Sequence, residues 1–118
     1  MNRLILLAGM ILSTATAANA AQPSDQNAIS AGHALSLEFC ASCHVVAADQ
    51  PKPPLYANAP PSFAAIANRG TTTTASLRRF VRTTHPTIAA PLKMPGVQVT
   101  DDQLDQIVAY IISLRHSH

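Results

Sequence analysis

The most regular pattern of hydrophobic and polar positions lies near the C-terminus. Apolar residues recur there every three or four positions: Leu104, Ile107, Val108, Ile111 and Leu114. This spacing is typical of a helix with one buried face. Thr100 and Gln103 have the spacing of a capping box. Acidic residues come directly after Thr100, and Arg115 lies near the other end; the helix dipole favours both placements. The pattern predicts a helix over residues 101–115.

Three further helices are predicted upstream, over residues 31–44, 63–68 and 75–84. Each follows a residue that can cap it: Ser30, Ser62, and Thr73 or Thr74. Proline-rich stretches at 45–61 and 87–99 separate or follow these helices, and such a density of proline excludes regular elements. No stretch reads as a strand, so we expect an all-α domain of about four helices.

The N-terminus has the features of an export signal. A basic start at Arg3 precedes the apolar stretch 4–12, and Ala18-Asn19-Ala20 fits a cleavage site. A retained membrane anchor is the alternative, but the apolar run is shorter than the ~20 residues that a spanning helix needs. We therefore expect a cleaved signal peptide at 1–20, a periplasmic location, and one domain at 21–118 that begins with a loose polar leader at 21–29.

The chemistry of the chain is concentrated in Cys40-Ala-Ser-Cys43-His44. Cys-x-x-Cys-His is the attachment sequence of a c-type haem. Cysteines at i and i+3 lie on the same side of a helical turn, so both thiols can add to the vinyl groups of one porphyrin. The following histidine can then bind the iron. The motif predicts one haem c, covalent through Cys40 and Cys43, with His44 as an iron ligand.

Other roles for this pair of cysteines are less consistent with the sequence. A redox disulfide does not require the histidine and usually occurs in a βαβ context. A zinc site would need further ligands, yet the chain has only 2 cysteines and no suitably spaced histidine pair. A structural disulfide would be strained at this short separation.

The composition indicates a small hydrophobic core with few large side chains. The chain has no tryptophan and only 4% aromatic residues, and small domains often need a covalent or cofactor staple. A buried haem would supply the missing apolar centre. The formal net charge of +2 falls to +1 when Arg3 leaves with the signal peptide, so a nucleic-acid partner is not expected.

In its order of parts the chain resembles class I cytochrome c. That family has a helix ending in the haem motif, a loop, short helices, a Met-Pro segment and a final helix. The corresponding parts here are residues 31–44, 45–61, 62–84, Met94-Pro95 and 101–115. The resemblance implies a small cytochrome c-like fold packed around one covalently bound haem.

The resemblance also implies roles for individual residues. Met94 would be the second axial ligand, with His85 as its rival. Pro61 would accept a hydrogen bond from the axial imidazole, and Arg69 would contact a haem propionate.

A further correspondence concerns the crossing of the first and last helices. The family crosses them at a glycine, here Gly32, against an aromatic residue, here Tyr110, and Ile107 matches a packing position. Ser36 stands where the family often has a bulkier residue. These residues are expected to be structural.

The function expected from the resemblance is periplasmic electron transfer by a monohaem carrier that cycles between Fe(III) and Fe(II) and is not itself an enzyme. One alternative is a cytochrome subunit of a periplasmic dehydrogenase or oxidase. Another is a haem enzyme or ligand sensor with an open sixth site.

Expected partners are redox proteins, such as a periplasmic dehydrogenase or a membrane oxidase or reductase. We expect a monomer without a membrane span once the signal is cleaved. Basic residues could form a docking face for an acidic partner or a solvated helix face; they are Arg69, Arg78, Arg79, Arg82 and Lys93.

Overall fold

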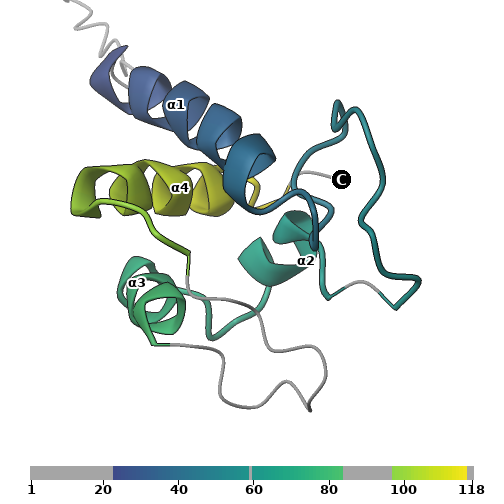
Figure 1. Ribbon diagram of the computed structural model, residues 1–118. Coiled ribbons are helices and arrows are strands. Elements are labelled where there is room, and N and C mark those ends of the chain that lie inside the picture. Colours follow the sequence, from purple (N-terminus) through teal and green to yellow (C-terminus); the bar gives the residue numbers. More distant parts are fainter. Residues whose placement is uncertain (1–22, 59, 84–96, 117–118) are drawn as a thin grey trace, which may run out of the picture.

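The computed structural model describes residues 23–58, 60–83 and 97–116. These ranges contain four helices and no strand (Figure 1). The helices are α1 (Pro23–Phe39), α2 (Phe63–Ala67), α3 (Thr74–Arg82) and α4 (Asp101–Ser113). The prediction of an all-α fold with about four helices is confirmed.

The most extensive contact between helices is the crossing of α1 and α4, which lie side by side (Figure 1). Gly32 stands at the crossing. A Cβ atom there would overlap the backbone carbonyl of Gln106 and lie 2.9 Å from the Cβ of Tyr110. The Ser36 hydroxyl, fully buried one turn later, donates to the carbonyl of Gly32 at 2.7 Å. The hydroxyl of Ser36 can be buried because it makes this hydrogen bond within α1.

The start of α1 differs from the prediction. The helix begins at Pro23 rather than after Ser30, so the loose leader predicted for residues 21–29 is wrong from residue 23 onward. Two local features suit the longer helix. Proline is compatible with the first helical turn, and Asp25 lies in that turn, where the helix dipole favours a negative charge. Ile29 also packs against the core, which holds this part of the helix in place.

The other three helices begin directly after residues that the sequence predicted as their N-caps. The Ser62 hydroxyl accepts from the amide of Ala65 at 3.1 Å. Thr73, rather than Thr74, caps α3 in a reciprocal box with Ser76. Thr100 and Gln103 form the predicted box at α4, with hydrogen bonds of 2.9 and 3.2 Å. These local starts were accessible to sequence reasoning because each depends on residues three positions apart.

The apolar face of α4 forms the centre of the core. Its buried residues are Leu104, Ile107, Val108, Tyr110 and Ile111, and Leu114 is half-buried. They meet Val46, Phe63, Ala67 and Leu77 from the loop, α2 and α3. Among the described residues, no helix has the length and apolar character to cross a membrane.

Ion pairs join α3 to the start of α4. Arg78 pairs with Asp105 and lies 3.9 Å from Asp101, and Arg82 also pairs with Asp101. The two aspartates are more than half exposed and the two arginines are partly exposed, so each pair contributes only about 0–1 kcal/mol. Their larger effect is on surface charge. The acidic partners cancel much of the positive charge of two arginines in the expected basic face.

Arg115 makes contacts that the sequence did not predict. Its guanidinium donates to the carbonyl of Ala67 at 3.2 Å and to that of Thr72 at 2.8 Å. It therefore satisfies a carbonyl at the end of α2 and another in the loop before α3, in addition to lying at the end of α4. The segment between α2 and α3 is held in place from the C-terminus.

Candidate functional site

A cavity of about 340 Å3 opens between the end of α1, the short helices and α4. Apolar side chains form most of its wall: Cys40, Phe63, Ile66, Leu77, Phe80, Val81, Val97, Ile107 and Ile111. The polar lining is His44, Arg69, Thr71, Thr72, Ser76 and Arg79. A largely apolar hollow with a few polar groups is typical of a site for a small molecule or cofactor.

The Cys-x-x-Cys-His motif lies at this cavity, directly after α1. Backbone amides of Cys43 and His44 donate to the carbonyl of Cys40 at 3.1 and 2.9 Å, which continues a helical turn through the motif. Cys40 is buried and Cys43 half-buried, and both thiols are free. Of the two, Cys40 lines the cavity.

The environment of Cys40 does not favour thiol redox chemistry. Burial, with a smaller contribution from Cys43, raises the pKa of the Cys40 thiol to about 11. Reactive cysteines in redox motifs instead have a lowered pKa that favours the thiolate. The raised pKa disfavours the Cys40 thiolate, which is the reactive form in a redox disulfide motif.

His44 is buried and its ring is held in one orientation. Its Nδ1–H donates to the carbonyl oxygen of Pro61 at 2.9 Å, and its ring centroid lies 5.5 Å from that of Phe63 at a tilt of 55°. The hydrogen bond expected of Pro61 is thus present. Because Nδ1 carries the proton in this bond, Nε2 is the nitrogen left to bind a metal.

The proline-rich loop after the motif is held in place by hydrogen bonds. The amide of Phe63 donates to the carbonyl of Val45, and the amide of Leu55 donates to that of Ser42, each at 2.9 Å. Gln50 accepts from the amide of Val46 at 2.9 Å and donates to the carbonyl of Ala41 at 3.0 Å. Sequence reasoning missed Gln50, because no local pattern distinguishes it from other polar loop residues.

Arg69 and Arg79 both line the cavity. Arg69 was expected to contact a haem propionate, whereas Arg79 was grouped only with the basic surface. Unlike Arg78 and Arg82, neither has an ion pair within the part of the chain that the structure describes. These two guanidinium groups are therefore available to an anionic group at the cavity.

Met94, His85 and Lys93, which the sequence singled out, lie outside the described residues. The structure does not place them relative to His44.

The residues at the cavity fit a haem. The apolar wall suits the faces of a porphyrin, and His44 offers an imidazole nitrogen whose opposite nitrogen is already bonded. Two free thiols stand on the same turn as that histidine, and two arginines of the lining suit carboxylates. A zinc or disulfide site would not need an apolar hollow of this kind.

Comparison with known proteins agrees with this geometry. A sequence model of the family described as cytochrome c matches residues 29–115. Cytochrome c-552 of Bradyrhizobium diazoefficiens is 36% identical over 109 residues, which cover 90% of each chain. No solved structure gives a significant match. The match covers most of the chain, including the haem motif and all of α2, α3 and α4, and the chain therefore belongs to the cytochrome c family, monohaem electron-transfer proteins with covalently attached haem c.

Proposed function

We propose that the protein is a free, exported electron carrier in which His44 and Met94 are the two iron ligands. The observation that carries the proposal is the orientation of His44, with Nδ1 bonded to Pro61 and the ring beside an apolar cavity. When bound, the haem supplies one-electron chemistry between Fe(III) and Fe(II).

Each residue then has a defined task. His44 would bind iron through Nε2, and the carbonyl of Pro61 would fix the ring and raise its basicity as a ligand. The thioether of Met94 would fill the sixth position and favour the ferrous form. With both axial positions filled, no position remains for a substrate, which supports a carrier rather than an enzyme.

Arg69, which lines the cavity, would pair with a haem propionate. A guanidinium forms charge-assisted hydrogen bonds to a carboxylate. Its positive charge would also favour the carboxylate form over the protonated form.

The location and partners follow from the same proposal. The N-terminal pattern at residues 1–20 supports export to the periplasm and release of a soluble domain. Redox proteins there, such as a dehydrogenase or a membrane oxidase or reductase, would exchange electrons with it.

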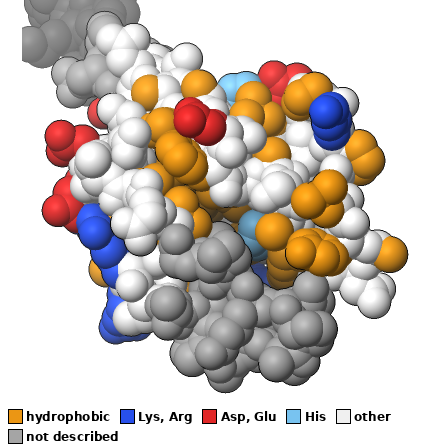
Figure 2. All heavy atoms as spheres, viewed as in Figure 1, with side chains coloured by type: hydrophobic (Ala, Val, Ile, Leu, Met, Phe, Trp, Pro, Cys, Tyr) orange, Lys and Arg blue, Asp and Glu red, His pale blue; other side chains and the backbone are white. Residues whose placement is uncertain are grey.

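A second candidate, a permanently bound subunit of such an oxidoreductase, is favoured by one surface feature. Leu55 is 78% exposed and Tyr56 is 47% exposed, and hydrophobic side chains gather on this face over the long loop (Figure 2). The amide of Leu55 is bonded to Ser42, within the haem motif. An apolar patch beside the motif would suit a lasting interface.

Spectroelectrochemistry of the mature holoprotein tests the carrier proposal. We expect one reversible one-electron transition, and no binding of carbon monoxide to the ferrous protein because the sixth position is filled. Fractionation of the native host should recover a chain that starts at Ala21 from the periplasm. Binding of carbon monoxide by the wild type would contradict the two-ligand site, and recovery only as a stoichiometric complex would favour the subunit.

A further inference from the structure

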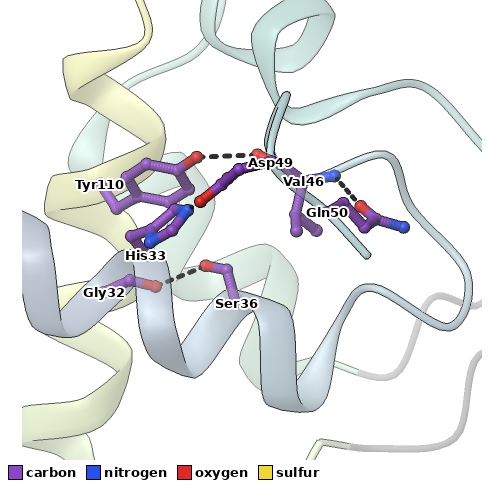
Figure 3. Close-up of polar contacts among 7 residues, drawn as sticks. All are labelled: Gly32, His33, Ser36, Val46, Asp49, Gln50 and Tyr110. Carbon is purple, nitrogen blue, oxygen red and sulfur yellow. Dashed lines mark hydrogen bonds and ion pairs between the residues drawn. The ribbon is translucent and has the colours of Figure 1, made fainter. Parts of the chain in front are cut away.

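A hydrogen bond connects the last helix to the segment that carries His44. The hydroxyl of Tyr110, in α4, donates to the carbonyl of Val46 at 2.9 Å (Figure 3). Both residues are buried, and Val46 lies two positions after His44 in the chain. Sixty-four positions separate the two bonded residues, so this bond is made by tertiary structure alone.

Each of the three residues 44–46 has a hydrogen-bond partner beyond the segment. Pro61 accepts from the ring of His44, Phe63 donates to Val45, and Gln50 accepts from the amide of Val46. These three partners belong to the loop or to its junction with α2. The bond from Tyr110 instead connects the segment to α4, so the carbonyl of Val46 is the point at which residues 44–46 are bonded to the last helix.

Tyr110 is itself held in place by its surroundings. It lies at the crossing where Gly32 lets the two helices approach. The ring of His33 meets it edge-on, with centroids 5.2 Å apart and planes at 72°. Nε2 of His33 donates to Asp49 at 2.9 Å (Figure 3).

The hydroxyl also remains a donor at neutral pH. Burial raises the pKa of Tyr110, and the nearby carboxylate of Asp49 raises it further. The carbonyl of Val46 is buried, so losing this donor would leave it without a hydrogen bond.

We propose that Tyr110 is a positioning residue for the iron-binding histidine, and that its hydroxyl transmits the geometry of the α1–α4 crossing to His44. The inference rests on the proposed role of His44 as an axial ligand. It goes beyond the packing role expected for Tyr110, because packing needs the ring whereas positioning needs the hydroxyl.

The test compares Tyr110→Phe with Tyr56→Phe in the holoprotein. Phenylalanine keeps the ring at the crossing and removes only the donor. Tyr56 is the other tyrosine of the chain and lies exposed in the same loop that contains Val46, so it provides a matched control. The measurements are the reduction potential and the hydrogen exchange of the His44 Nδ1–H, followed by nuclear magnetic resonance.

We expect Tyr110→Phe to keep its haem and to exchange the His44 ring proton about fivefold faster, since one hydrogen bond contributes about 1 kcal/mol. Its reduction potential should also shift, while Tyr56→Phe should match the wild type in both measurements. If Tyr110→Phe only lowers the melting temperature and leaves exchange and potential unchanged, Tyr110 is a packing residue and the inference is wrong.

Two further observations keep the test decisive. If Tyr110→Phe does not mature, the wild type is measured instead. We expect the proton of the Tyr110 hydroxyl to exchange as slowly as the His44 ring proton, and rapid exchange of the hydroxyl proton beside a protected His44 ring would overturn the inference. Iron-shifted ring resonances of His44 in the ferric wild type establish its ligation beforehand. Their absence would mean that the proposed function has failed, rather than the inference about Tyr110.

Discussion

The Nδ1–H of His44 donates to the carbonyl of Pro61, 17 positions later, across 2.9 Å. This bond selects one tautomer of a buried imidazole and leaves Nε2 as the metal-binding nitrogen. It also joins the two ends of the proline-rich loop, together with the bond from the amide of Phe63 to Val45. Two bonds at the start and end of the loop therefore fix the position of the imidazole relative to α2.

Gly32→Ala should destabilise the protein strongly. The new Cβ would overlap the backbone carbonyl of Gln106, which cannot rotate away as a flexible side chain can. Overpacking of this kind costs about 1–3 kcal/mol of unfolding free energy or more. Gly70→Ala is the matched control, since nothing lies within 4 Å of its added Cβ. Denaturant unfolding of the holoproteins measures both, and equal stability of the two variants would contradict the close crossing.

Arg69→Ala and Arg78→Ala should differ in their effect on the reduction potential. Arg69 lines the cavity without an ion pair among the described residues, whereas Arg78 is paired with Asp105. Removing Arg69 should lower the potential, because its positive charge near a propionate stabilises the reduced state. Removing Arg78 should change the potential less, since the charge of Asp105 partly offsets it. Equal shifts measured by redox titration would remove Arg69 from the site.

Asp49→Asn should destabilise the protein at neutral pH but not in acid. The hydrogen bond from His33 holds the pKa of Asp49 below its ordinary value. A lowered pKa means that the folded state favours the carboxylate, so the stabilisation is present above the ordinary pKa of aspartate, about 3.9. It is lost as the pH falls through the lower, folded-state pKa.

The corresponding experiment is denaturant unfolding of the wild type and Asp49→Asn across acidic and neutral pH. The stability difference between them should shrink as the pH falls. Asp102→Asn is the control, because Asp102 is an exposed residue of α4 without an ion pair in the described ranges. A difference that grows toward low pH would contradict the assigned bond.

Met94→Ala should keep the covalent haem but open the sixth iron position. The variant should bind cyanide or carbon monoxide and should have a lower potential, because a thioether ligand favours ferrous iron. His85→Ala is the control and should behave like the wild type. Ligand titrations followed by absorption distinguish the two, and the reverse ranking would make His85 the ligand.

Local signals explain which parts of the structure were predictable. The caps at Ser62, Thr73 and Thr100 depend on neighbours three positions away, so these helix starts followed from the sequence. The bond between His44 and Pro61 was expected only through the resemblance to a family, because nothing local relates the two residues.

Tertiary contacts explain the rest. Arg115 bonds to carbonyls more than 40 positions away, and Tyr110 bonds to Val46 at an even larger separation. The early start of α1 likewise depends on the packing of Ile29 against the core, which no pattern within residues 21–29 reveals. Pairing of Arg78 and Arg82 with acids on α4 also weakens the basic docking face that the sequence indicated.

The central claim is that Cys40 and Cys43 hold one haem covalently, and acid–acetone extraction followed by the pyridine haemochrome spectrum tests it most directly. We predict that the matured wild type keeps its haem through extraction, at one haem per chain. Its haemochrome should be that of a porphyrin with both vinyl groups saturated, and Cys40→Ala and Cys43→Ala should each show one unsaturated vinyl group. Release of the haem from the wild type, or its retention by the double Cys→Ala variant, would contradict the account.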